Sequence, residues 1–209
     1  MSSQYRLHAA PLTRTAQRWW RTTDPAASAR EVLEHVIGIG QLLPLVRFAD
    51  ARVFPVVTFD PHALWTRRHQ APAALLDPAT VRDVLTSPGH DQHTPSAVRM
   101  VAFIGIDPLY RARQDLLGLR PLARTIALTP SGAIPQAMTL TSFDLQGTAV
   151  VTAGNPPQVV VGGDPGVRAG TAMSPVWRRF FEEQLYDWAM RTDSIPAQEP
   201  VVHAFSDFG

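Results

Sequence analysis

The sequence contains no cysteine and no lysine, and these two absences exclude several common chemistries. Without cysteine the chain has no thiol nucleophile, no disulfide, and no thiolate ligand for zinc or an iron–sulfur cluster. All 19 basic residues are arginine. The chain therefore lacks the primary amine of a Schiff base, a pyridoxal-phosphate anchor, a kinase lysine or a complete Walker loop. Arginine, the cation that remains, binds planar anions through paired hydrogen bonds.

Long apolar runs and runs of a single charge are missing as well. No stretch approaches the roughly 18–20 apolar residues that cross a bilayer. The early arginines Arg6, Arg14 and Arg18 have no apolar block of a secretory signal between them. We therefore expect a cytoplasmic chain without a membrane span. The net charge is +1 and no basic run is present, so the sequence carries no nucleic-acid signature.

The length and composition favour one domain with short extensions at both ends. The chain has 209 residues, of which 45% are hydrophobic, and can bury a sizeable core. We interpret residues 1–23 as an N-terminal arm with a short helix. Residues 24–193 are predicted to form a single α+β domain, and residues 194–209 a C-terminal tail.

The first half of the chain is predicted to be rich in helices. Aspartate accepts the free amide hydrogens at a helix start, and proline has no such hydrogen, so an Asp-Pro pair predicts a helix start. The pair recurs at residues 24–25, 60–61, 77–78 and 107–108. β-Branched and aromatic residues predict strands over 52–59 and 98–106.

The second half is predicted to form an antiparallel β-meander closed by an aromatic C-terminal helix, which gives an α+β fold. Alternating or β-branched residues indicate strands near 126–128, 138–141, 148–152 and 159–161. Ser174-Pro175 then predicts the start of a helix over 174–191.

One stripe of that helix is predicted to be apolar. Trp177, Phe181, Leu185 and Trp188 recur at spacings of four, four and three. We interpret Glu182-Glu183 as part of a solvated, charged face of the same helix, with arginines one turn earlier as partners.

The segment Arg18-Trp19-Trp20-Arg21 is the leading candidate for a binding site. Adjacent residues on a helix point about 100° apart, so one tryptophan can be buried while the other stays near the surface. Aromatic residues flanked by arginine are typical of protein interfaces, and also of a helix docked on a core. Our leading hypothesis is a non-enzymatic protein–protein interaction or assembly protein that binds a protein partner or itself, without a cofactor.

Histidines give the alternative hypothesis of a metal-dependent enzyme, either a hydrolase or an oxygenase. His90 and His93 are three residues apart, and His62 and His69 lie seven apart on a predicted helix. Such a cluster could hold Zn or Fe, with a nearby aspartate as a further ligand. A solvated loop with unrelated histidines is the competing interpretation of the segment around His90.

A third hypothesis is phosphate or nucleotide binding at the glycine-rich loop 162–170. Gly163, Gly166 and Gly170 could bring backbone amides close to an anion, and Arg168 could add a bidentate contact. The loop does not have the Rossmann spacing or the lysine of a Walker loop. A plain connection that needs the backbone freedom of glycine explains it as well.

Overall fold

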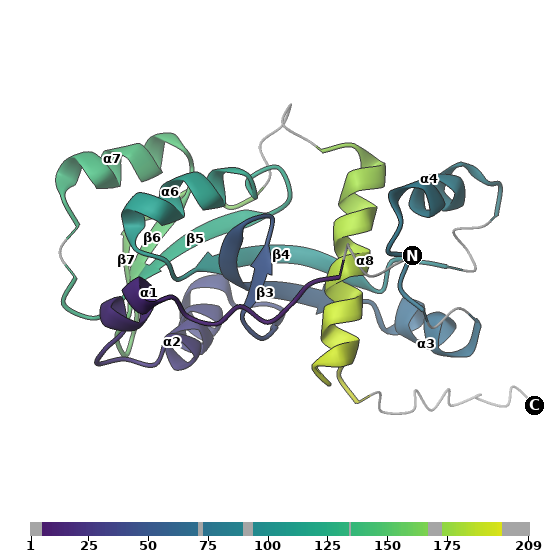
Figure 1. The fold of residues 1–209 in the computed structure, drawn as a ribbon, viewed down its shortest axis with the longest axis horizontal. Helices are drawn as coiled ribbons and strands as arrows, with labels where there is room; N and C mark the ends of the chain where they lie inside the picture. The colour runs from purple at the N-terminus through teal and green to yellow at the C-terminus, as the bar shows by residue number, and fades with distance from the viewer. Residues whose placement is uncertain (1–5, 71–72, 90–93, 134, 167–172, 198–209) are drawn as a thin grey trace, which may run out of the picture.

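The computed structural model describes residues 6–70, 73–89, 94–133, 135–166 and 173–197. In this part of the chain a seven-stranded sheet lies between helices on both of its faces (Figure 1). The strands are β1 Gln41–Leu42, β2 Val46–Phe48, β3 Ala51–Phe59, β4 Val98–Gly105, β5 Arg124–Thr129, β6 Ala149–Thr152 and β7 Gln158–Val161. The helical segments are α1 Arg14–Trp19, α2 Pro25–Val32, the π-helical turn η2 Leu33–Ile37, α3 Pro61–Gln70, α4 Pro78–Thr86, α6 Leu109–Leu117, α7 Ala137–Leu145 and α8 Pro175–Arg191.

The α+β class and the closing C-terminal helix are confirmed, but the sheet is mixed. Its order is β1-β3-β4-β5-β6-β7, with β2 also paired to β3. Strands β4, β5 and β6 are parallel to one another, whereas β3 pairs with β4, and β7 with β6, in the antiparallel sense. The predicted hairpin of β6 and β7 is therefore present, and the predicted continuous antiparallel meander is not.

The error lies at residues 138–141, which were predicted as a strand and belong to α7. Four residues are too few to distinguish a period of 2 from a period of 3.6. In the helix the hydroxyl groups of Thr141 and Ser142 each donate to the carbonyl four residues earlier. Phe143 is fully buried against the sheet, so tertiary packing favours the helix.

The two faces of the sheet carry separate cores, because successive residues of a strand point to opposite faces. Phe103 and Ala127 lie in the core beneath α6, α7 and α8. Their neighbours Ile104 and Ile126 lie in the opposite core, beneath α1, α2 and η2. Each core is dry, since all four of these side chains have no exposed surface.

Three of the predicted Asp-Pro helix starts are confirmed by their hydrogen bonds. The carboxylates of Asp24, Asp60 and Asp77 accept amide hydrogens in the first turns of α2, α3 and α4. Asp107 is different: it is buried and accepts from the Arg52 guanidinium at 3.2 Å, and α6 begins after Pro108. An aspartate next to proline therefore becomes an ion-pair partner where a strand places an arginine beside it.

Helix α8 is buried on more sides than its apolar stripe predicts. Leu185 and Trp188 are buried as expected, whereas Trp177 is 47% exposed. Glu182 and Glu183, predicted on a solvated face, are 9% and 1% exposed, which corrects that interpretation. The reason is visible in Figure 1, where α3 and α4 lie on the far side of α8 from the sheet.

The carboxylate of Glu183 joins α8 to α3 through a buried ion pair. Arg67, with 0% exposure, donates from both terminal nitrogens to the two carboxylate oxygens at 2.9 Å. The Arg179 Nε and the Leu75 amide also donate to this carboxylate, at 3.0 and 2.9 Å. Four donors compensate the cost of burying the negative charge.

No described helix combines the length and the apolar character that a membrane span requires. The cytoplasmic location and the domain boundaries at residues 23 and 193 stay predictions. The predicted arm nevertheless contributes to the cores, because Leu7, Ala16 and Trp20 are buried in the described structure.

Replacing Glu183 by glutamine should destabilise the fold strongly. The change removes the negative charge that the fully buried Arg67 guanidinium faces, which costs about 3–5 kcal/mol of unfolding free energy. Chemical denaturation of the wild type and the variant measures this loss. The control is Asp50→Asn, which breaks the exposed Arg47–Asp50 pair and should have little effect. Equal losses in the two variants would contradict the role of the buried pair.

Glu182 should make the stability depend on pH in the opposite sense to a carboxylate whose pKa is lowered by folding. Burial raises the pKa of Glu182 above its ordinary value of 4.5, although Ser96 and Arg179 oppose the shift. The folded state therefore binds the Glu182 proton more tightly than the unfolded state does. Protonated Glu182 contributes stability at low pH, and this contribution is lost as the pH rises above 4.5. In Glu182→Gln this loss should be absent.

The measurement is the unfolding free energy of the wild type minus that of Glu182→Gln, taken at several values between about pH 4 and pH 8. We expect this difference to fall as the pH rises. A difference that stays constant, or that rises with pH, would show that burial does not raise the pKa of Glu182.

Candidate binding site

The parallel strands bring the starts of two helices to one edge of the sheet. Strands β4, β5 and β6 all end at this carboxyl edge. Helix α6 follows β4, and α7 follows β5, so both helices begin there. In open sheets with parallel strands, ligands characteristically bind outside the carboxyl ends of the strands.

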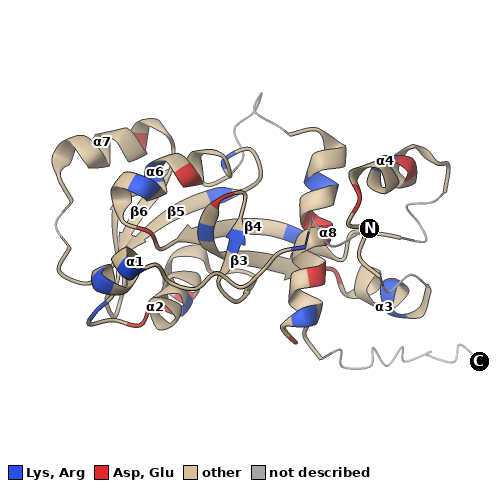
Figure 2. Cartoon of the chain, in the orientation of Figure 1, with Lys and Arg blue, Asp and Glu red and all other residues tan. Residues whose placement is uncertain are grey.

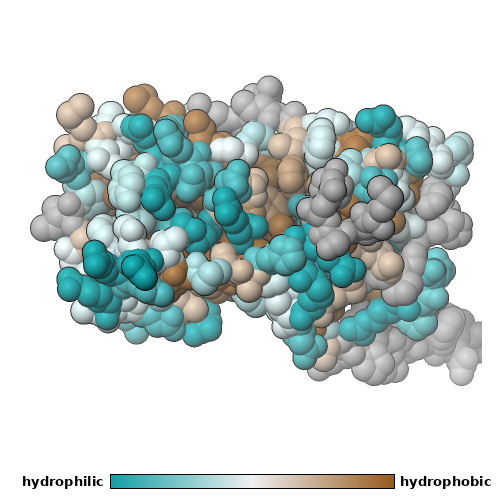
Figure 3. All heavy atoms as spheres, viewed as in Figure 1, coloured by the Kyte–Doolittle hydropathy of each residue, from teal (hydrophilic) through white to brown (hydrophobic). Residues whose placement is uncertain are grey.

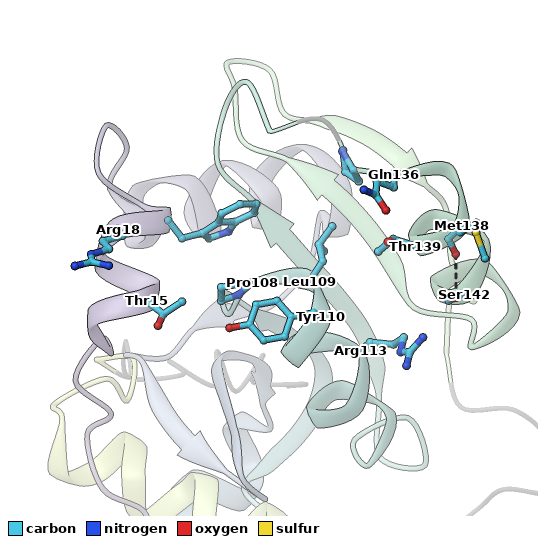
Figure 4. Close-up of a pocket in the computed structure, with 12 residues that line it drawn as sticks. Thr15, Arg18, Pro108, Leu109, Tyr110, Arg113, Gln136, Met138, Thr139 and Ser142 are labelled. Carbon is cyan, nitrogen blue, oxygen red and sulfur yellow. Dashed lines mark hydrogen bonds between the residues drawn. The ribbon is translucent and has the colours of Figure 1, made fainter.

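A pocket of about 800 Å³ lies at this carboxyl edge, between α1, α6 and α7. We call it the carboxyl-edge pocket. Figure 4 shows Thr15 and Arg18 of α1 on one side, Gln136 and Thr139 on the other, and Tyr110 of α6 between them. The described residues that line the pocket come from these three helices and from the segments before α6 and α7.

The position of α1 depends on Trp20, which follows its last turn. Trp20 is 5% exposed, and its indole Nε1 donates at 2.8 Å to the carbonyl of Ile106, just beyond the end of β4. The Thr13 hydroxyl accepts the Ala16 amide hydrogen and caps the helix start. These contacts hold the preceding turn, with Arg18 and Trp19, against the mouth of the pocket.

The residues of the predicted interaction segment therefore lie in different environments. Arg18 and Trp19 line the carboxyl-edge pocket, whereas Trp20 belongs to the core. Arg21 is exposed and does not line the pocket. The expectation that one tryptophan of the pair is buried and the other is nearer the surface agrees with these positions.

The charges on the wall of the pocket all have one sign. Arg18 and Arg113 line it, and no acidic residue is among the described lining residues. Both arginines are exposed, and neither makes a hydrogen bond or an ion pair within the described part of the chain. The starts of α6 and α7 have no side-chain cap. The partial positive charge of their first amides therefore adds to the positive charge of the two arginines.

Apolar side chains make up much of the remaining wall. Trp19 and Leu109 line the pocket, Tyr110 is 64% exposed, and Met138 is 84% exposed. A flexible methionine and a tyrosine that presents both a ring and a hydroxyl are well suited to an adaptable contact. The pocket therefore combines apolar surface with positive charge.

Tyr110 is the described lining residue whose side chain is of a kind that acts in general acid–base catalysis. Among the lining residues that the structure describes there is no histidine, aspartate or glutamate, and the chain has no cysteine or lysine. General acid–base catalysis most often uses these groups.

The predicted histidine cluster is tested only in part. His62 and His69 of α3 are exposed, and the His69 ring packs on Trp65 with 4.5 Å between the ring centroids. The His69 Nδ1 atom is 2.7 Å from the Trp65 carbonyl oxygen. His90 and His93 lie outside the described residues, so the Zn or Fe site stays a prediction.

Another group of potential metal ligands lies at the end of α2 and in η2. Ligand atoms of Glu31, Glu34 and His35 fall within 4.8 Å of one another. The His35 ring faces the Glu31 carboxylate at 3.5 Å, as the spacing of four residues predicts. Both glutamates and the histidine are at least partly exposed, and solvated groups of this kind are common without a metal.

The glycine-rich loop has a structural explanation where it is described. Gly163 has a φ of +63°, and a Cβ atom there would lie 2.4 Å from the Ala149 nitrogen. The Asp164 amide donates to the Gly147 carbonyl at 2.9 Å, and its carboxylate accepts from Arg120 at 2.8 Å. The loop thus packs at the amino end of β6, at the opposite edge of the sheet from the pocket.

Other residues of this loop are less informative. Gly166 has open space around the position of a Cβ atom, so close packing does not explain it. Arg168 and Gly170 lie outside the described residues. Phosphate or nucleotide binding here stays a prediction, and the Asp164 carboxylate brings a negative charge to the site.

Several pocket residues had no signal in our sequence analysis, notably Tyr110, Arg113, Gln136 and Met138. Their signal is the order strand, helix, strand along the chain. This order predicts parallel strands whose connecting helices begin at the carboxyl edge of the sheet. Our assignment of 138–141 to a strand removed the second of these helices.

The fold and the pocket define a class of protein: an α+β chain whose mixed sheet lies between helical layers and carries a positively charged pocket at its carboxyl edge. No family model matches the chain, and comparisons with curated proteins and with solved structures found no match. The chemistry of the pocket is therefore the guide to function.

The two tryptophans should respond differently to replacement by phenylalanine. Trp20→Phe removes the donor to the Ile106 carbonyl, and we expect a loss of about 1–3 kcal/mol of unfolding free energy. The Trp19 Nε1 is buried without a hydrogen-bond partner among the described residues, so Trp19→Phe loses no such bond. Denaturant titration of both variants measures the contrast. A larger loss in Trp19→Phe would refute this assignment of roles.

Proposed function

We propose that the protein is a non-enzymatic interaction protein that binds a protein partner, or a second copy of itself, through the carboxyl-edge pocket. The observation that carries this proposal is the composition of the pocket wall. Tyrosine, tryptophan, methionine and arginine line it, and these four residue types are enriched in protein interfaces. Histidine, aspartate and glutamate are not among the described residues of this wall.

An exposed apolar surface continues from the pocket over the same helices. Leu117 of α6 is 49% exposed and Leu145 of α7 is 75% exposed, each seven residues after an exposed apolar residue of the pocket. Figure 3 shows hydrophobic side chains at the surface in the region of α7. Exposed apolar surface next to polar and charged groups is characteristic of a protein contact.

This proposal changes which residues of the predicted segment take part. Trp20 supports the fold, and its replacement would report on stability instead of binding. Arg18 and Trp19 remain candidates for direct contact, together with Tyr110 and Met138. A test of the interaction must therefore use exposed positions, where substitution usually changes stability by less than about 0.5 kcal/mol.

The double variant Tyr110→Ser/Met138→Ser should lose the association of the wild-type chain. Native mass spectrometry and light scattering on the full chain, purified without a metal-affinity column, measure the stoichiometry and any bound partner. The matched control is Trp65→Ser/Leu85→Ser, which removes two exposed apolar side chains from α3 and α4. We expect the control to keep the association.

Two results would refute the proposal. One is a wild-type chain that stays monomeric and without a partner over the whole concentration range. The other is an association that the control variant reduces as much as the pocket variant does.

A further inference from the structure

We infer that the segment that enters the carboxyl-edge pocket is an acidic peptide, with an apolar anchor residue and carboxylates on both sides of it. This inference deepens the proposed function and rests on it. It follows from the separate positions of the positive charges, the apolar surface and the hydrogen-bond donors around the pocket.

Positive charge lies on both helices that flank the mouth. Arg14 and Arg18 belong to α1, and Arg111 and Arg113 belong to α6. All four side chains are exposed, and none makes an ion pair within the described residues. Figure 2 shows arginine on both helices. The acidic residue of α6, Asp115, instead lines a small cavity with Arg52.

The separate positions of these charges suit an extended ligand. Figure 4 shows Arg18 and Arg113 at opposite ends of the mouth, with the Tyr110 ring between them. An extended segment can place one carboxylate near each of them, because both guanidinium groups are exposed and bind carboxylates through paired hydrogen bonds.

Much of the wall near these charges is apolar. Trp19, Leu109, Tyr110 and Met138 contribute this surface, and Thr15, Gln136 and Thr139 add polar groups to the wall. A large apolar or aromatic side chain would be covered there on several sides, and such a side chain is the usual anchor of a peptide in a pocket. The alternation of positive, apolar and positive surface therefore matches a negative, apolar and negative ligand.

Hydrogen-bond donors are available at the pocket. The first amides of α6 and α7 have no side-chain acceptor, and the lining side chains of Gln136 and Thr139 can donate as well as accept. Carboxylates and backbone carbonyls are acceptors, and a peptide supplies both kinds. Nucleic acid also supplies acceptors, but it usually binds along a basic groove. Here the apolar anchor surface favours a peptide.

The test uses three labelled seven-residue peptides and a labelled single-stranded DNA of ten thymidines as probes. The first peptide has Phe-Leu at its centre and carboxylate residues on both sides. The second replaces every Asp and Glu by Asn and Gln, and the third replaces Phe-Leu by Ser-Gly. Fluorescence anisotropy with the full chain gives each affinity at low and at high salt.

We expect the first peptide to bind most tightly, and each altered peptide to bind roughly threefold or more weakly. Arg18→Gln/Arg113→Gln should weaken the first peptide by a similar factor, remove its preference over the neutral peptide and reduce the salt dependence. The control Arg82→Gln/Arg99→Gln removes two exposed arginines away from the pocket and should leave the affinity unchanged.

Equal affinity for the acidic and neutral peptides would overturn the inference, as would an unchanged affinity in Arg18→Gln/Arg113→Gln. Tighter binding of the DNA with the same arginine dependence would overturn it in favour of a nucleic acid. If the native association still depends on Tyr110 and Met138, such a result removes the acidic peptide but keeps the proposed function. If the association is independent of these residues, the proposed function fails as well.

Discussion

The direction of three neighbouring strands determines where this protein can bind a partner. Strands β4, β5 and β6 are parallel. After each of the first two strands the chain must therefore return over a face of the sheet before the next strand begins, and α6 and α7 form these two connections. Such crossovers are almost always right-handed, which places both helices on one face and their starts at one edge. The positive ends of two helices then lie beside each other, and the pocket opens between them and α1.

The hydrogen bond from Trp20 to the Ile106 carbonyl completes this arrangement. It joins the first helix of the chain to the end of β4, 86 residues later. Helix α1 supplies one wall of the pocket, and α6 and α7 supply the others. The same tryptophan thus links the core of the fold to the geometry of the binding site, while its neighbour Trp19 lines the pocket.

A second long-range interaction holds the other end of the molecule. Glu183 of α8 is buried beside Arg67 of α3, and two more donors satisfy its carboxylate. Ion pairs in a protein interior contribute little net stability compared with apolar residues, but breaking one is costly. This pair therefore fixes how α3 packs against α8, more than it adds to the total stability.

Local signals in the sequence predicted the features that depend on a few neighbouring residues. The caps at Asp24, Asp60 and Asp77 follow from one carboxylate and a proline, and the hairpin of β6 and β7 follows from β-branched runs around a turn. The α+β class and the closing helix α8 follow from similar patterns.

Features that depend on distant contacts could not be predicted in the same way. The burial of Glu183 requires an arginine 116 residues earlier, and the helical state of residues 138–141 requires the packing of Phe143 on the sheet. For the site, the sequence indicated Arg18 and Trp19 but not Tyr110 or Met138. These residues meet only because the parallel strands bring α1, α6 and α7 to one edge.

The central claim is that the carboxyl-edge pocket is where this protein makes its contact. Methyl NMR of chain labelled at its five methionines tests this directly, since Met138 is the methionine that lines the pocket among the described residues. The account predicts that the Met138 methyl signal shifts between the dissociated and the associated chain, while those of Met100 and Met190, packed against the core, do not. An unchanged Met138 signal in the associated state would contradict it.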